Sequence, residues 1–231
     1  MLTDPPPPGR GGRPAAGGGR VLDVAPERLG RWLDGVADRH GSFTDVRVDD
    51  AGVVHVTCTD TTTLALTAPY GWTPPSGATL AAFGAAVRAP HRTAVLLVRR
   101  GRWAVGVFDG AQLVVSKVDA RQVQGRTAAG GWSQQRFARR RGNQTDAVVT
   151  HAADTAARVL LPHAGGTRAL ATGGDKGLVA EVIADPRLRA LAALPRLGPL
   201  DVGEPTKAVL LETPPRFRAV RVHIVEPGDR S

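Results

Sequence analysis

The chain has 231 residues, of which 42% are hydrophobic and 22% charged, the composition of an ordinary globular protein with one large or two small domains. Its 30 lysines and arginines against 21 acids give a net charge of +9, which favours a nucleic-acid or other anionic partner. The single cysteine, Cys58, excludes an internal disulfide framework and a cysteine-based zinc site. Because no segment approaches the roughly 20 apolar residues of a membrane span, we expect a soluble, cytoplasmic protein without a membrane partner.

The first part of the chain predicts a tail followed by a small domain. Residues 1–20 are rich in Pro, Gly and Arg and lack the apolar residues of a core, so we expect a disordered tail there. Residues 21–90 predict a small α+β domain, in the order helix, three strands, helix. We place these elements at residues 26–40, 43–48, 53–58, 61–67 and 78–88.

The remainder, residues 91–231, predicts a second domain whose order is β-β-β-α-β-α-β-β. That order indicates a mixed sheet with helices on its faces and resembles ribonuclease-H-like topology. The strands are expected at 93–98, 103–108, 113–118, 168–172, 208–212 and 220–225. The helices are expected at 143–161 and, with a break at Pro186, at 178–192. The first helix could begin near Gln134, with Gly142 as an interior weak point that costs about 1 kcal/mol.

A basic stretch between the third strand and the long helix carries the most unusual chemistry. Residues 121–144 hold six arginines and no acid, and residues 130–141 read GGWSQQRFARRR. Paired glycines permit backbone conformations that other residues cannot adopt. Arginines suit a polyanion, while glutamine offers neutral hydrogen-bonding groups. The stretch therefore predicts a mobile cationic loop that carries a polar side chain into an RNA-lined site.

The run from Gly130 to Arg139, leading into a long helix, resembles the middle domain of eukaryotic and archaeal class-1 peptide release factors. Those proteins have a Gly-Gly-Gln loop, a Ser and then an Arg-Phe-Ala-Arg run, with three strands before the loop. In a gap-free match Trp132 takes the place of the family's glutamine, and Gln134 lies two positions later. This Gly-x-x-Gln spacing resembles the Vms-type branch, and most of all its actinobacterial members, known as peptidyl-tRNA hydrolases. Members of that branch act in ribosome quality control and release nascent chains from stalled, split ribosomes.

The resemblance implies roles for particular residues. Gln134 would position the attacking water, while Gly130 and Gly131 would give the loop its shape; Gln135 is the alternative catalytic residue if the loop register differs. Trp132 would either stack on a base or pack the loop onto the domain. The side chains expected to contact RNA are Arg126, Trp132, Arg136, Arg139, Arg140 and Arg141.

The implied activity is hydrolysis of the ester of peptidyl-tRNA on a stalled large ribosomal subunit. Such a hydrolysis needs a placed water and donors for the oxyanion, so we expect neither a metal nor a cofactor. The expected partners are the large subunit, peptidyl-tRNA and ribosomal RNA, with the protein acting as a monomer. Two alternatives stay open: a ribosome-binding module that has lost the chemistry, and a nuclease that cleaves the tRNA. Against the nuclease, the strands after Thr93 lack the carboxylate cluster that two-metal chemistry needs.

Overall fold

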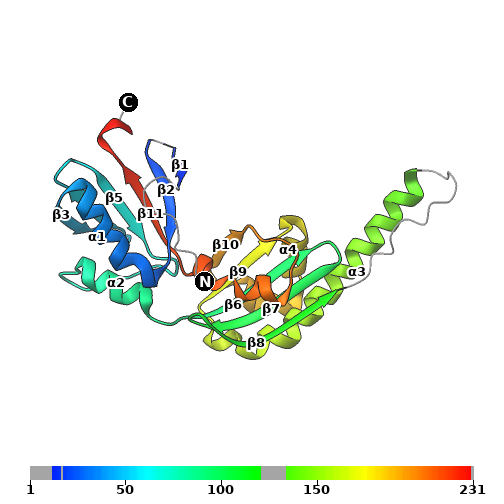
Figure 1. Ribbon diagram of the computed structural model, residues 1–231. Coiled ribbons are helices and arrows are strands. Elements are labelled where there is room, and N and C mark those ends of the chain that lie inside the picture. Colours follow the sequence, from blue (N-terminus) through cyan, green and yellow to red (C-terminus); the bar gives the residue numbers. More distant parts are fainter. Residues whose placement is uncertain (1–11, 17, 121–133, 230–231) are drawn as a thin grey trace, which may run out of the picture. The chain divides into compact units, whose positions relative to one another are not determined.

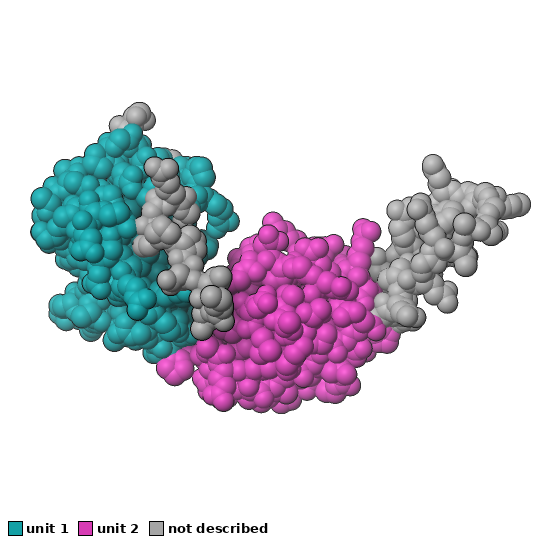
Figure 2. All heavy atoms as spheres, viewed as in Figure 1, with its two compact units in different colours: residues 1–89, 218–231 teal, residues 90–217 magenta. Residues whose placement is uncertain are grey.

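The computed structural model describes residues 12–16, 18–120 and 134–229, with the backbone alone described for 134–145. The chain forms two compact units (Figure 2). Unit 1 is built from Met1–Ala89 together with Arg218–Ser231, and unit 2 is Pro90–Phe217. Each unit has its own sheet and its own hydrophobic core.

Unit 1 contains an antiparallel sheet of six strands in the order β1-β2-β11-β5-β4-β3 (Figure 1). These strands are β1 (Arg13–Pro14), β2 (Arg20–Val24), β11 (Val220–Val225), β5 (Thr63–Thr67), β4 (Val54–Cys58) and β3 (Phe43–Val48). Alternate residues of β4, β5 and β11 are buried, as expected for a sheet with one covered face.

Two helices cover that face of unit 1. Helix α1 (Leu29–His40), preceded by the short η1 (Pro26–Arg28), buries Trp32 and Val36, and α2 (Leu80–Arg88) buries Phe83. The short η4 (Pro227–Asp229) follows β11. Buried residues of α1, α2 and the sheet form one hydrophobic cluster, so the predicted α+β pattern of helix, three strands and helix is confirmed.

The expected disorder of residues 1–20 is wrong for the part that the structure describes. Arg13 pairs with Val21, and Pro14 pairs with Arg20. Gly19 has φ +73°, and a Cβ added to it would lie 2.2 Å from the carbonyl oxygen of Ile224. Glycine therefore lets the chain turn tightly against β11, a constraint that composition alone does not reveal. Residues 1–11 lie outside the described residues.

Unit 2 contains a mixed sheet of five strands in the order β10-β9-β6-β7-β8. These strands are β6 (Arg92–Arg99), β7 (Arg102–Asp109), β8 (Gln112–Ala120), β9 (Ala169–Gly174) and β10 (Arg196–Leu200). Strands β6, β7 and β8 form an antiparallel meander, whereas β9 runs parallel to β6 and β10 parallel to β9. The interior of β6 and of β7 is buried over six consecutive residues, as in strands covered on both faces.

Helices cover both faces of this sheet, as predicted. On one face α3 (Gln134–Leu160) and α4 (Lys176–Ile183) share a core with alternate residues of β6 and β7. On the other face Leu210 lies against Gly106, and Phe108 meets Phe217 edge to face at 5.7 Å. The remaining helical segments are η2 (Leu161–Gly166), η3 (Pro186–Leu188), α5 (Arg189–Ala192), α6 (Lys207–Leu211) and α7 (Pro214–Phe217).

Two expectations about the end of the chain differ from the structure. Residues 208–212, predicted as a strand, lie mostly in α6, because Thr206 caps that helix by accepting a hydrogen bond from the Val209 N–H at 3.2 Å. We also expected residues 91–231 to form one domain, but β11 pairs with β2 and β5 in unit 1. Its buried residues Val220, Val222 and Ile224 complete the core of unit 1.

Candidate functional site

Helix α3 is the element that carries most of the predicted site residues. Its C-terminal half is anchored on the sheet of unit 2 by a stripe of small and branched apolar residues. The stripe consists of Val148, Ala152, Ala153, Ala156 and Leu160. The alanines let the helix approach the sheet closely, so this half of α3 is a fixed support for the half that precedes it.

A buried polar contact fixes the C-terminal half of the helix. The Trp103 Nε1–H of β7 donates to Thr155 Oγ1 at 3.0 Å, and Thr155 Oγ1 in turn donates to the His151 carbonyl at 2.8 Å. The indole of Trp103 is also stacked on the His151 ring, with centroids 6.3 Å apart and an interplanar angle of 8°. Because Trp103 and Thr155 are both buried, this contact sets the rotation of α3 about its axis.

An ion-pair network on the surface ties α3 to η3. Arg187 Nη1 donates to Asp154 Oδ1 at 2.7 Å, and Arg187 Nη2 donates to Asp185 Oδ2 at 2.7 Å. The hydrogen bonds from the Arg187 side chain, and then from its backbone N–H, lower the pKa of Asp185 to about 2. The Asp185 carboxylate therefore stays ionised and paired with Arg187 throughout the neutral range.

The structure places the predicted catalytic and RNA-contacting residues in two groups. Arg126, Gly130, Gly131 and Trp132 lie outside the described residues. The second group, whose backbone lies at the start of α3 and whose side chains are not described, comprises Gln134, Gln135, Arg136, Arg139, Arg140 and Arg141.

The prediction that the helix could begin near Gln134 is confirmed, since Gln134 is the first residue of α3. At 1.5 Å per residue, Gln134 stands about 21 Å along the helix from Val148, where the buried stripe begins. Positions 136, 139 and 140 are three and four residues apart, a spacing that puts them on one side of a helix.

The segment that precedes α3 leaves the sheet at a defined place. Strand β8 ends at Ala120, Ala120 pairs with Arg102 of β7, and Arg102 pairs with Arg99 of β6. We call the end of the sheet marked by these three residues the loop end. The Arg102 Nε–H lies 3.0 Å from Glu204 Oε1, and Lys117 Nζ lies 3.7 Å from Asp119 Oδ2, so part of the charge near this end is compensated.

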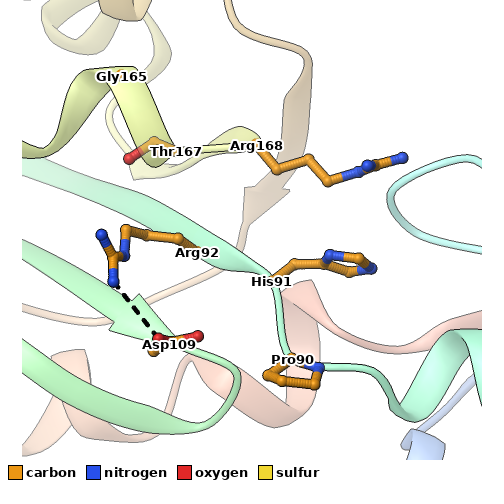
Figure 3. Close-up of a pocket in the computed structure, with 8 residues that line it drawn as sticks. Pro90, His91, Arg92, Asp109, Gly165, Thr167 and Arg168 are labelled. Atoms are coloured by element: carbon orange, nitrogen blue, oxygen red, sulfur yellow. Dashed lines mark hydrogen bonds and ion pairs between the residues drawn. The ribbon is translucent and has the colours of Figure 1, made fainter.

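An open depression of about 470 Å³ lies at the opposite end of the same sheet (Figure 3). It is lined by Pro90, His91, Arg92, Asp109, Gly165, Gly166, Thr167 and Arg168. Arg92 Nη2 lies 3.5 Å from Asp109 Oδ2, and Figure 3 shows Arg92 and Arg168 extending in opposite directions. The depression contains none of the residues predicted for the site, and no motif in the sequence pointed to it.

Two histidine–carboxylate pairs in the described ranges make structural contacts in unit 1. His55 Nε2 lies 2.9 Å from Asp49 Oδ2, and this hydrogen bond lowers the pKa of Asp49. His40 Nδ1 lies 2.8 Å from Asp60 Oδ2. Within residues 12–16, 18–120 and 134–229, no three His, Cys, Asp or Glu residues gather in a way that could hold a metal ion. No helix in that part of the chain is long and apolar enough to cross a membrane.

Comparison with known proteins gives one family match. A model of the family described as "Actinobacteria/chloroflexi VLRF1 release factor" matches residues 91–223. No curated protein matches the chain.

Two solved structures are similar to the chain at low identity. One is the crystal structure of an archaeal translation termination factor, aRF1, which has 15% identity over 82% of this chain and 61% of that one, with a TM-score of 0.36. The other is described as an archaeal protein and has 15% identity over 84% and 62% of the two chains, with a TM-score of 0.30. The chain thus spans about three fifths of the length of these two structures.

Proposed function

The chain belongs to the actinobacteria/chloroflexi VLRF1 release-factor family, and from this premise we propose that it hydrolyses the ester of peptidyl-tRNA on stalled large ribosomal subunits. The observation that carries the proposal is the Gly130-Gly131-x-x-Gln134 spacing inside the matched region, at the start of an anchored helix. The partners would be the large subunit, its RNA and peptidyl-tRNA.

The chemistry of ester hydrolysis suits a glutamine. Its amide can accept from and donate to one water while staying neutral, so Gln134 would place the water beside the ester carbon. Because α3 begins at Gln134, the free N–H groups of its first turn lie in the same place, where they favour developing negative charge. The glycines at 130 and 131 would let the backbone approach RNA closely. The hydrolysis as proposed uses no metal and no cofactor.

The long basic helix would supply binding rather than chemistry. Arg136, Arg139, Arg140 and Arg141 would neutralise RNA phosphates, each adding about 0.7 to 0.9 to the salt slope of binding. The anchored half of α3 supports this role, because a helix fixed on the sheet can hold its N-terminal half at a constant distance from unit 2.

We also infer that unit 2 has ribonuclease-H-like topology. Strand β6 is central, with the antiparallel β7 and β8 on one side and the parallel β9 and β10 on the other. The chain crosses from β8 to β9 through α3 and from β9 to β10 through α4 and α5. This order supports the expected relation to the middle domain of class-1 release factors.

One observation favours a second candidate function, a ribosome-binding module without hydrolytic activity. Trp132 stands in the position that the glutamine occupies in a gap-free match to the class-1 factors. If the shifted Gln134 cannot reach the ester, the arginines would still bind RNA while the chemistry is lost.

The test is release of labelled nascent chain from purified large subunits that carry peptidyl-tRNA, comparing the wild-type protein with Gln134→Ala. We expect the substitution to keep subunit binding and to slow release by about 10²- to 10³-fold, the usual cost of losing one positioned polar group. Gln144→Ala, the same change later in α3, is the matched control and should release at the wild-type rate.

Other outcomes assign the role differently. Equal release by wild type and Gln134→Ala, with loss in Gln135→Ala, would move the role to Gln135. Binding without release by the wild-type protein would contradict the hydrolase and favour the binding module.

A further inference from the structure

The turn between β6 and β7 presents two arginines at the loop end of the sheet. Arg99 pairs with Arg102 across the hairpin, and Gly101 adopts φ +81°, so Arg100 and Gly101 form its tip. Arg99 and Arg100 are both exposed. Within the described part of the chain, neither guanidinium has an ion-pair partner, in contrast to Arg102, which meets Glu204.

A third cation stands beside this turn because the β9–α4 connection passes close to it. The Asp175 N–H donates to the Val98 carbonyl at 2.8 Å. A Cβ added to Gly174, which has φ +96°, would lie 3.2 Å from Arg99 Cγ and 2.2 Å from the Val98 oxygen. Only glycine fits at this position, and the short distance to Cγ shows that the aliphatic stem of Arg99 lies over the turn that leads into α4. The first residue of α4 is the exposed Lys176.

Arg99, Arg100 and Lys176, which we call the hairpin cations, form a positively charged surface. The nearby carboxylate of Asp175 is occupied by the Gly177 and Leu178 N–H groups, at 3.0 and 3.2 Å. Arg102 and Lys117 are matched by Glu204 and Asp119. Arg99, Arg100 and Lys176 outnumber the Asp175 carboxylate that lies next to them along the chain, so the surface keeps a positive charge and attracts anions.

The place of the hairpin cations connects them with the candidate site. Arg99 and Arg102 lie in one row across the sheet with Ala120, the residue from which the chain departs toward Gly130 and Gly131. The hairpin cations thus lie at the end of unit 2 from which the proposed catalytic segment leaves.

We propose that the hairpin cations bind phosphates of ribosomal RNA and thereby dock unit 2 at the site of peptidyl-tRNA hydrolysis. The planar guanidinium matches a phosphate with two parallel hydrogen bonds, and an arginine without an internal partner gives up no ion pair on binding. The inference rests on the proposed function, because the RNA is the one that surrounds the ester. The hairpin would act in binding alone, apart from the chemistry of Gln134.

The test is equilibrium binding of the full chain to purified large ribosomal subunits over a range of salt concentrations. Arg99→Ala/Arg100→Ala should weaken binding about tenfold at moderate salt and lower the slope of log K against log salt by about 1.4 to 1.8, as expected for two lost phosphate contacts. The matched control is Arg168→Ala/Arg189→Ala, which removes two exposed arginines of unit 2 away from the loop end. It should bind within about twofold of the wild type, since those two arginines lie outside the proposed contact.

Two further measurements separate the possible failures. Arg99→Ala/Arg100→Ala should raise the protein concentration needed for half-maximal release about tenfold, in step with its weaker binding. Gln134→Ala should instead bind normally and slow release by about 10²- to 10³-fold. Protein-free large-subunit RNA should show the same loss of affinity; a loss seen only with intact subunits would identify an acidic protein partner and overturn the proposal. Unchanged binding by Arg99→Ala/Arg100→Ala would also overturn it, and would leave the result for Gln134→Ala standing.

Discussion

Single buried polar atoms decide how α3 is held. The Trp103 indole N–H is buried between strand and helix, and Thr155 Oγ1 is the acceptor that the structure provides for it. A buried donor that loses its partner costs more than the bond contributes when it is made, because the donor has already given up its water. The hydrogen bond between Trp103 and Thr155 therefore fixes the rotation of α3 about its axis and also stabilises the fold.

The substitution Thr155→Val tests the contribution of this hydrogen bond. The substitution keeps the shape of the side chain but leaves the Trp103 N–H unpaired, so we expect the free energy of unfolding to fall by about 1–3 kcal/mol. Urea denaturation of the full chain measures this change in the free energy of unfolding. Thr150→Val is the control, because Thr150 donates to the Asp146 carbonyl at 2.8 Å in the same way but is exposed. Equal losses in the two variants would show that the backbone contact, rather than Trp103, carries the effect.

What the sequence reveals at this scale depends on how far apart the partners are. Gly130, Gly131 and Gln134 could be named because they form a short local motif. Trp103 and Thr155 are 52 residues apart, and no spacing rule connects them. The Arg99–Gly174 contact was equally inaccessible, because it depends on two turns that meet only after β6 and β9 pair.

Elements could be predicted where their apolar pattern, periodic or continuous, is long and uninterrupted. The apolar stripe of α3 and the buried runs of β6 and β7 are of this kind. Strand β10 was missed because its sequence RLGPL contains glycine and proline, which a strand tolerates mainly at the edge of a sheet, where β10 lies. Helix α6 was missed because a short apolar run suits either element until its capping threonine is considered.

The ion-pair network of Arg187 with Asp154 and Asp185, which ties α3 to η3, predicts that the stability of unit 2 depends on pH. Arg187→Ala removes both ion pairs, so we expect the melting temperature of unit 2 to fall by a few degrees at pH 7. The pKa of Asp185 is lowered from 3.8 to about 2 in the folded protein, so its stabilising contribution is complete above pH 3.8 and is lost as the pH falls toward 2. The difference between wild type and variant should thus be constant from pH 7 to 5 and shrink below about pH 4.

Calorimetry across this pH series measures the difference. Arg189→Ala is the control, since Arg189 is an exposed neighbour of Arg187 and has no ion-pair partner among the described residues. A difference between wild type and Arg187→Ala that persists undiminished at pH 2.5 would contradict a role for the Asp185 carboxylate.

At the scale of the whole molecule, the chain leaves unit 1, builds unit 2 and returns. Strand β11 lies between β2 and β5, so the last strand along the chain is an interior strand of the first sheet. Unit 2 is therefore inserted into unit 1 and joined to it at both ends, at the boundaries between 89 and 90 and between 217 and 218. The alternating pattern of β11 identified a strand, but alternation carries no information about which sheet the strand joins.

This insertion makes the integrity of unit 1 depend on the end of the chain. A chain that ends at Phe217 lacks β11. Without this strand β2 and β5 are no longer joined, and the core residues that Val220, Val222 and Ile224 cover become exposed. We expect amides of residues 20–89 to lose their protection from hydrogen exchange, while those of β6 and β7 keep it. A chain of residues 90–217 should be as protected as the same residues in the full chain, because every residue that the structure describes in the core of unit 2 lies within that range. Protection of β4 and β5 in the chain ending at Phe217 would contradict this dependence, since it would mean that unit 1 folds without its returning strand.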